Sequence, residues 1–461
     1  MLEKISHIKK NIKNSKITIL GCGKSGLSAA NLAHYNGAEI FISDKNNNSG
    51  IKKLISNKGF KFSEIGKHTN KCLDADLIIK SPGISNNEKI IKKIKNKKIP
   101  IISEIEFASW FTKNPIIGVT GSNGKSTTVK ILLELFKNKY KFTFLGGNIG
   151  IPFSLNVLEE INKNIKKCIH IVELSSFQLE DIYYFKPKVS CILNLSEDHL
   201  DRHQSRDDYY KSKLNIIKNI CKKSYFVYNS ENDDLTNLIN NKKQNYIPFG
   251  LHNENNSFFL KNNRIIDKES GGEIDCNKIK LKGKHNYANI IAALEICKIF
   301  DFDFKSSLKI IKNFNPLEHR MERIECNNKI TFINDSKATN INSTISAIDS
   351  FSNKIILILG GFSKGKTDYK NYINSKNIKT IICYGQEGKI IYNQLKIKYD
   401  SKYFKNFNDA VEFAVKISIL NDVVLLSPAC SSFDQFDNFE QRGDKFKDII
   451  NNYNFETKFK S

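Results

Sequence analysis

The sequence has no uninterrupted apolar run of the roughly 18 residues that a membrane-spanning helix needs. Its first 20 residues are basic but contain no apolar stretch followed by small residues, so we expect no secretory signal. The 10 cysteines stand singly, without a CxxC pair or the ligand spacing of a zinc site. Single thiols of this kind indicate a reducing compartment, and we predict a cytoplasmic protein without membrane insertion.

Acidic residues are scarce, since 48 Asp and Glu stand against 72 Lys and Arg, for a formal net charge of +24. Such an excess favours nucleic-acid binding when the basic residues are clustered. Here the lysines are spread along the chain together with Asn and Ile, and no RNA-binding motif stands out. We therefore expect no nucleic-acid partner, and keep an ATPase stimulated by RNA or DNA as an alternative.

The chain of 461 residues is too long for one hydrophobic core, which predicts several domains. Short apolar runs alternate with helical stretches, a pattern typical of α/β domains with mainly parallel sheets. We expect three domains, over residues 1–112, 113–316 and 317–461. The expected strands cover residues 16–21, 38–44, 77–83, 115–121, 169–175, 189–196, 330–334, 355–361, 380–385 and 422–427.

A glycine-rich turn follows the expected strand at 115–121 and has the chemistry of a phosphate-binding loop. Glycines allow backbone N–H groups to face phosphate oxygens, and the helix that begins here adds its positive dipole. Lys125 offers a mobile cation for the β and γ phosphates of ATP, and Ser126 a hydroxyl for Mg²⁺. The strict P-loop pattern has glycine at position 119, where this chain has Val119, so the loop is a shortened variant. The expected phosphate contacts are Gly121, Ser122, Asn123, Gly124, Lys125, Ser126 and Thr127.

Acidic and imidazole side chains follow two further strands of the same block. Glu173 lies near the end of one expected strand, and His199 lies in a Glu-Asp-His-Leu-Asp-Arg segment after the next. In an open α/β sheet the carboxyl ends of the strands face the ligand crevice. Carboxylate and imidazole beside a phosphate loop suit Mg²⁺, which takes few protein ligands and keeps phosphates and water for the rest. We therefore predict a magnesium site, with plain surface or capping groups as the alternative.

Motifs along nearly the whole chain resemble the Mur ligase family. They are GSNGKST (121–127), GGNIG (146–150), ELSSFQLE (173–180), LNLSEDHLDRH (193–203), KGKHNYAN (282–289), HRME (319–322), NDSKATN (334–340) and SPACSSFDQFDNFEQRG (427–443). The last two most resemble the branch of the family that adds D-glutamate. The resemblance implies a Rossmann-like first domain, a central P-loop-type ATPase domain and a Rossmann-like third domain. It implies a monomeric ligase that uses ATP to join D-glutamate to UDP-N-acetylmuramoyl-L-alanine through an acyl phosphate, in peptidoglycan precursor synthesis.

The resemblance also implies catalytic roles for Lys125, His199 and Lys213. Lys125 grips the phosphates, Ser126 and Glu173 hold one Mg²⁺, and His199 and Lys213 belong to the site of a second Mg²⁺. Lys213 matches the lysine that the family carbamylates with CO₂, a change that turns a cation into an anion able to bind near Mg²⁺. This reaction requires the neutral amine, which a desolvated and cation-rich site favours. The alternative is that Lys213 is one of many surface lysines.

Contacts to the substrates are implied in the same way. Asn289, Arg320 and Asp335 match contacts to the adenine, the phosphates and the ribose, while Asn148 and His199 match groups near the muramoyl substrate. The D-glutamate contacts implied are Lys337, Thr339, Lys364, Ser432 and Phe439. Two lysines and two hydroxyls suit an amino acid with two carboxylates.

Two positions in the last block leave alternatives open. Lys366 competes with Lys364 for the same place in the family pattern, because the stretch around both is variable. Cys430 could serve as a nucleophile, but no His–Asp pair stands nearby, so we favour a packed thiol.

A second glycine motif lies in the first block, where Gly21 to Gly26 satisfy GxGxxG and Asp44 ends the next expected strand. Alone, this pattern indicates an NAD-dependent oxidoreductase, an alternative that leaves the phosphate loop and the third block unexplained. In Mur ligases this domain instead binds the UDP of the substrate. The implied UDP contacts are Gly23, Lys24, Ser25, Asp44, Ser81, Pro82 and Gly83.

Relatives with other substrates remain as further alternatives. The L-alanine-adding relative favours a His in its phosphate loop, where this chain has Asn123. The relative that adds diaminopimelate or lysine carries a DNPR-type motif, which this sequence lacks. A folylpolyglutamate synthase is the last of these alternatives.

Overall fold

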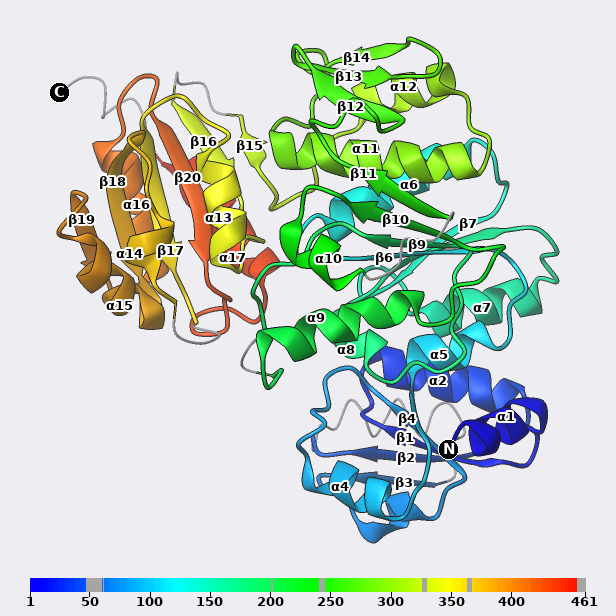
Figure 1. Ribbon diagram of the computed structural model, residues 1–461. Coiled ribbons are helices and arrows are strands. Elements are labelled where there is room, and N and C mark those ends of the chain that lie inside the picture. Colours follow the sequence, from blue (N-terminus) through cyan, green and yellow to red (C-terminus); the bar gives the residue numbers. More distant parts are fainter. Residues whose placement is uncertain are drawn as a thin grey trace.

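The computed structural model describes residues 1–46, 60, 62–199, 202–239, 245–325, 330–362 and 367–453. Figure 1 shows three lobes in chain order, with the first at the bottom, the second at the centre and right, and the third at the left. Each lobe is built around its own sheet, and the three-part α/β architecture predicted from the sequence is confirmed. Within the described ranges, no helix is long and apolar enough to cross a bilayer.

The first lobe holds a five-stranded parallel sheet. Its strands run in the order β3 (Phe62–Ile65), β2 (Glu39–Asp44), β1 (Lys16–Leu20), β4 (Leu77–Lys80) and β5 (Ile101–Ser103). Its helices are α1 (Leu2–Lys10), α2 (Lys24–Tyr35), η1 (Asn70–Leu73), α4 (Lys89–Asn96) and α5 (Glu104–Ser109). The strand order reverses at β1, which places a ligand crevice at the carboxyl ends of β1 and β4. Gly26 allows α2 to pack there, because a Cβ at this position would lie 1.9 Å from the Gly21 carbonyl oxygen.

The second lobe holds a six-stranded parallel sheet. The order is β11 (Tyr246–Phe249), β10 (Tyr225–Asn229), β9 (Val189–Ile192), β6 (Ile116–Thr120), β8 (Ile169–Glu173) and β7 (Thr143–Gly147). Its helices are α6 (Lys125–Lys137), α7 (Phe153–Asn162), α8 (Ser176–Leu179), α9 (Arg206–Leu214), η2 (Asn215–Ile217), α10 (Asp233–Leu238), α11 (Lys284–Ile299) and α12 (Phe304–Asn313). Every residue of β6 and β8 is buried, as in a parallel sheet covered by helices on both faces. The strand order reverses around β6, so its carboxyl end faces a second crevice.

A small antiparallel sheet in the second lobe was not predicted. It consists of β12 (Phe258–Lys261), β13 (Arg264–Asp267) and β14 (Glu273–Asp275). Ile265 and Ile274 from this sheet share a hydrophobic core with helix α11, which the sheet covers. The strands have three or four residues each, too few to give a clear alternating pattern in the sequence.

The third lobe holds a six-stranded sheet that is parallel except for its first edge strand. The order is β15 (Glu322–Ile324), β16 (Thr331–Asn334), β20 (Val423–Ala429), β17 (Ile355–Gly360), β18 (Ile378–Tyr384) and β19 (Ser401–Phe404). Its helices are α13 (Ile341–Ile348), α14 (Tyr369–Tyr372), α15 (Gly385–Leu395), α16 (Phe407–Ile417) and α17 (Phe439–Asn452). The two edge strands β15 and β19 were not predicted either, because both are short and carry charged residues.

Two expected strands end three or four residues earlier than predicted. The strand expected at 77–83 ends at Lys80, and the one expected at 189–196 ends at Ile192. Pro82 has no N–H to donate to a ladder, so the first correction follows from its chemistry. Leu193 and Leu195 are buried although they lie in a loop, which extended the apolar pattern beyond the second strand. Both corrections turn strand residues into loop residues at a crevice.

The first two lobes are joined by buried polar contacts. The Lys80 ammonium lies 2.8 Å from the Asp181 carboxylate and 3.3 Å from that of Glu180. On α5, the Glu106 carboxylate accepts backbone N–H groups from residues 183–185. The domain limits at 112 and 316 stay a prediction.

Candidate active site

The phosphate-binding loop connects β6 to α6 and depends on its glycines. Gly121 and Gly124 have φ values of +153° and +84°, a region that side chains disfavour. A Cβ at Gly124 would also lie 2.3 Å from the Asn289 side-chain oxygen. The Asn123 N–H donates to the Asn194 side chain at 2.9 Å, which fixes the loop to the segment after β9. Its shape is therefore preset before any nucleotide binds.

Two lysines meet at this loop. Lys125 at the start of α6 donates to the carbonyl oxygens of Gly121 and Ser122, at 2.7 and 2.9 Å. Lys213 on α9 donates to the same Gly121 oxygen at 2.9 Å and is only 1% exposed. Burial, and secondly the positive charge of Lys125, hold the pKa of Lys213 well below its ordinary value. Lys213 therefore lies inside the site and not on the surface, in surroundings that favour the neutral amine.

An acidic side chain faces the loop from the end of β8. Glu173 is 1% exposed, and its Oε1 atom accepts a hydrogen bond of 2.8 Å from the Asn148 amide. Its Oε2 atom has no hydrogen-bond partner among the described residues, although it is buried. A buried carboxylate oxygen without a partner is costly. The Ser126 hydroxyl lies in the same cavity as Glu173, so this donor set fits a divalent cation bound beside the phosphates.

His199 also lines this cavity, in a strained backbone conformation with φ at +55°. Its Nε2 atom is 3.8 Å from a carboxylate oxygen of Asp198, and its ring packs edge-on against Phe177. Strain of this kind persists only where the surrounding contacts enforce it. These contacts hold His199 at the cavity, in the loop after β9.

A first cavity, of about 200 Å³, lies between the second and third lobes beside the loop. Asn289, Arg320 and Asp335 line it, as does Thr127. Burial raises the pKa of the Asp335 carboxyl to about 7, although Ser427 donates to it at 2.9 Å. Its remaining lining is mostly apolar or uncharged, including Leu193, Phe249 and Leu281, which suits a nucleotide base. His285 also lines this cavity. It was not predicted as a site residue, although it lies within the KGKHNYAN motif (282–289).

A second cavity, of about 570 Å³, brings the three lobes together. The first lobe contributes Lys24 and Ser25. From the second and third lobes, the predicted residues that line it are Ser122, Asn123, Lys125, Ser126, Asn148, Glu173, His199, Arg320, Lys337, Thr339 and Phe439. A neighbouring cavity of about 460 Å³ adds Lys213 and Ser432. Most predicted site residues of the second and third lobes, with Lys24 and Ser25 of the first, therefore line cavities that share lining residues.

Several predicted residues of the first lobe lie outside the residues that line these cavities. Asp44 accepts the N–H of Cys22, the Ser81 hydroxyl donates to the Gly21 carbonyl at 3.0 Å, and Arg202 donates to the Pro82 carbonyl. Gly23 and Gly83 likewise line none of them. These residues lie instead at the carboxyl ends of β1, β2 and β4, at the crevice of the first sheet.

The predicted contact Lys364 and its alternative Lys366 lie outside the described residues. Cys430 is 2% exposed, and burial raises the pKa of its thiol to about 12, which opposes a nucleophilic thiolate. Its sulfur lies 3.4 Å from the Tyr369 hydroxyl, as in a packed core.

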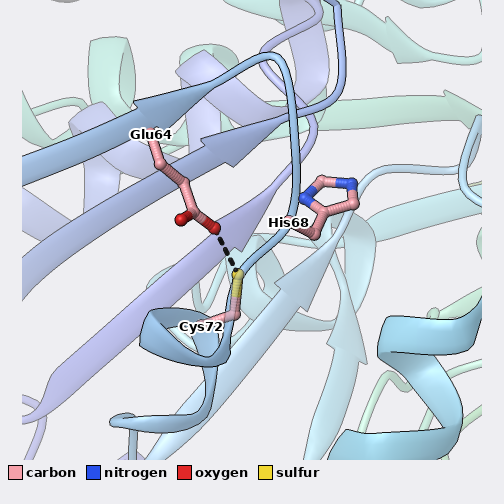
Figure 2. A group of neighbouring side chains, drawn as sticks. All are labelled: Glu64, His68 and Cys72. Carbon is pink, nitrogen blue, oxygen red and sulfur yellow. Dashed lines mark hydrogen bonds between the residues drawn. The ribbon is translucent and has the colours of Figure 1, made fainter.

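A polar cluster near Asp44 was not predicted. Figure 2 shows Glu64, His68 and Cys72 turned toward one another, with the Cys72 thiol donating to Glu64 at 3.0 Å. The Glu64 carboxylate also accepts hydrogen bonds from Ser43 and, twice, from Thr69. These four donors satisfy the carboxylate without a metal ion. The cluster thus fixes the turn after β3 at the edge of the first crevice.

Comparison with known proteins agrees with this three-lobed arrangement. Three family models match in chain order: "Mur ligase MurD-like, N-terminal domain" over residues 15–103, "Mur ligase middle domain" over 119–297 and "Mur ligase, glutamate ligase domain" over 319–430. The chain belongs to the Mur ligase family.

Curated relatives match along nearly the whole chain. Proteins named UDP-N-acetylmuramoylalanine–D-glutamate ligase are 40% identical in Elusimicrobium minutum, 38% in Buchnera aphidicola and 36% in Christiangramia forsetii. Each alignment covers 95% of this chain, and 98%, 98% and 99% of the respective relative.

Solved structures share the fold at low sequence identity. A pseudomurein peptide ligase type C from Methanothermus fervidus matches with a TM-score of 0.60 and 18% identity, over 95% of this chain and 99% of that one. A MurF ligase from Thermotoga maritima in complex with ADP matches with a TM-score of 0.59 and 17% identity, over 96% of both chains.

Proposed function

We propose that this protein is the ATP-dependent ligase that joins D-glutamate to UDP-N-acetylmuramoyl-L-alanine in peptidoglycan precursor synthesis. One observation carries the proposal. Lys125, Glu173 and Lys337, from two different lobes, line a single cavity next to the phosphate loop. The chain that builds this cavity matches ligases of that name at 32–40% identity along nearly its whole length.

The reaction proceeds in two steps. The terminal carboxylate of the L-alanyl substrate attacks the γ-phosphate of ATP and forms an acyl phosphate with release of ADP. The amine of D-glutamate then attacks the acyl carbon, and the tetrahedral intermediate expels phosphate as the peptide bond forms. Both steps move negative charge across the phosphate loop, so preset positive groups stabilise them electrostatically.

The groups of this chain act mainly by position and charge. The loop N–H groups and the α6 dipole face the phosphates. Lys125 leaves the Gly121 and Ser122 carbonyls and follows the γ-phosphate, and Arg320 lies beside Ser126, at 3.4 Å between side-chain atoms. Asn289 and Asp335 lie in the first cavity, where they bind the adenine and the ribose.

The proposed site has places for two Mg²⁺ ions. Ser126 and Glu173 would hold one, while His199 and a carbamate on Lys213 would serve the second. When bound, Mg²⁺ neutralises charge on the transferring phosphoryl group. The lowered pKa of Lys213 supports the carbamate, because only a neutral amine reacts with CO₂.

The two other substrates bind on either side of the loop. The UDP moiety occupies the crevice of the first lobe, along Gly23, Lys24, Ser25, Asp44 and the segment Ser81, Pro82 and Gly83, and Asn148 and His199 approach the muramoyl part. D-Glutamate binds to the third lobe through Lys337, Thr339, Ser432 and Phe439, with Lys364 as a further predicted contact. The cytoplasmic location and the monomeric state stay predictions.

The oxidoreductase alternative has less support. The GxGxxG turn and Asp44 do lie at a dinucleotide-type crevice, but the second and third lobes converge on a phosphate loop that hydride transfer does not use. No specific observation favours the nucleic-acid-stimulated ATPase.

Lys337 makes the use of D-glutamate sensitive to pH. Burial, and secondly the charge of Arg320, lower the pKa of Lys337 to about 8. The cation that attracts a glutamate carboxylate is therefore present below about pH 8 and lost above it. We expect kcat/KM for D-glutamate in the wild type, divided by that of Lys337→Arg, to fall about tenfold between about pH 7 and about pH 9. The ratio cancels ionisation of the D-glutamate amine, and a constant ratio would contradict the role of Lys337.

The proposed chemistry can be tested by isotope transfer. The substrate is prepared with ¹⁸O in its terminal carboxylate, and the released phosphate is analysed by mass spectrometry. An acyl phosphate requires that one labelled oxygen leaves with each phosphate. Unlabelled phosphate at full ligation rate would exclude this route, and phosphate release stimulated by RNA or DNA would favour the rival ATPase.

A further inference from the structure

The third lobe touches the phosphate loop through the start of helix α13. The Asn340 amide donates to the Asn123 side-chain oxygen at 3.2 Å and to an Asp198 carboxylate oxygen at 3.1 Å. The Ser343 hydroxyl donates to the same Asn123 oxygen at 2.7 Å. Three hydrogen bonds therefore connect two lobes at the loop that binds the phosphates.

These contacts lie between the two main cavities. Asn123 and Ser343 line both the cavity of about 200 Å³ and the cavity of about 570 Å³. Asp198 directly precedes His199, and its other carboxylate oxygen accepts the His199 N–H at 2.8 Å. The contact thus joins the loop, the His199 segment and the third lobe at one point.

Asn340 also follows directly on residues assigned to D-glutamate. Lys337 and Thr339 lie in the same connection between β16 and α13, and both line the second cavity with Asn340. The hydrogen bond from Asn340 to Asp198 therefore sets the position of this connection relative to the terminal carboxylate of the L-alanyl substrate. Small displacements of a positioned nucleophile reduce rates strongly.

We propose that Asn340, assisted by Ser343, is a positioning residue that docks the D-glutamate-binding connection onto the phosphate loop and Asp198. The inference rests on the proposed function and deepens it. Docked, the connection holds the amine against the acyl carbon and keeps water out. Undocked, water attacks the acyl phosphate, which returns the substrate carboxylate and phosphate and consumes ATP without forming a peptide bond.

The substitution Asn340→Asp isolates this contact. The Asn340 side-chain oxygen caps α13 by accepting the Ser343 N–H at 2.9 Å, and Asp caps a helix equally well. The variant thus keeps the helix and places two carboxylates together where a hydrogen bond stood. A reciprocal swap, Asn340→Asp with Asp198→Asn, restores a donor and an acceptor across the contact. Asn353→Asp is the matched control, since this exposed residue of the same lobe contacts only Asn421 among the hydrogen bonds described.

The decisive measurement is phosphate released per peptide bond formed, together with kcat/KM for D-glutamate. We expect Asn340→Asp to raise the phosphate ratio above the wild-type value and to lower kcat/KM roughly 10- to 100-fold. The swap should bring both the phosphate ratio and kcat/KM much of the way back to their wild-type values. Asn353→Asp should match the wild type in both. A slow Asn340→Asp variant that keeps the wild-type ratio would show a merely structural role and overturn the inference. A swap no better than the single variant would also overturn it. A wild type that forms no D-glutamate product contradicts the proposed function, and the inference fails with it.

Discussion

Replacing Lys125 with alanine is expected to lower the ligation rate roughly a thousandfold or more, because the variant loses the mobile cation that follows the γ-phosphate. Lys125 begins α6 and folds back onto the carbonyls of Gly121 and Ser122. Lys213 also donates to Gly121, so the loop keeps one of these contacts in the variant. The loss should therefore appear in kcat for phosphate release and not in the folding of the protein.

Lys137→Ala provides the control on the same helix. Its side chain is about half exposed and, among the residues that the structure describes, pairs only with Glu134, three residues earlier. Exposed pairs of this kind contribute little, so this variant should retain the wild-type rate and thermal stability. A Lys125→Ala enzyme with normal turnover would remove the phosphate loop from the mechanism.

Replacing Lys213 with alanine is the second large effect. We expect kcat to fall roughly a hundredfold or more, because the proposed carbamate and its negative charge beside Mg²⁺ are lost. A small carboxylate such as formate or acetate fits the space that the side chain leaves and supplies the missing anion. Steady-state rates measured with increasing formate should therefore rise for this variant, and only for this variant.

Lys211→Ala is the matched control for this experiment. Lys211 lies on the same helix α9 but is exposed, so its loss should change neither the rate nor the response to formate. Wild-type activity in Lys213→Ala would remove the carbamate from the account. A low rate without any response to carboxylates would leave Lys213 as a packing residue.

Local sequence patterns predicted the elements that carry the chemistry. The phosphate loop is readable because glycine, lysine and serine follow a β-branched strand directly. Glu173 and His199 stand near strand ends, and parallel strands carry such side chains to one edge of a sheet. Lys125 and Lys213 both donate to the Gly121 carbonyl oxygen, but they lie too far apart in sequence for any local pattern to predict this. The sequence could therefore place Lys213 only through its resemblance to a family.

Contacts between lobes were beyond prediction. Asn340 meets Asp198 across 142 positions of sequence, and no periodicity or spacing encodes such a pair. The short antiparallel strands around Ile265 were not predicted for a different reason. Their structure depends more on tertiary packing against α11 than on local preference. The same applies to Glu64, His68 and Cys72, whose common cluster depends on the turn after β3.

The most direct test of the central claim is product formation from UDP-N-acetylmuramoyl-L-alanine and ATP with a set of amino acids. D-Glutamate is compared with L-glutamate, L-alanine and lysine, and the UDP-linked product is identified by mass. The account predicts that only D-glutamate gives a product, with one phosphate released for each peptide bond. A product with another amino acid would keep the mechanism but contradict the assignment of the third lobe, and the absence of product with all four would contradict the proposed function.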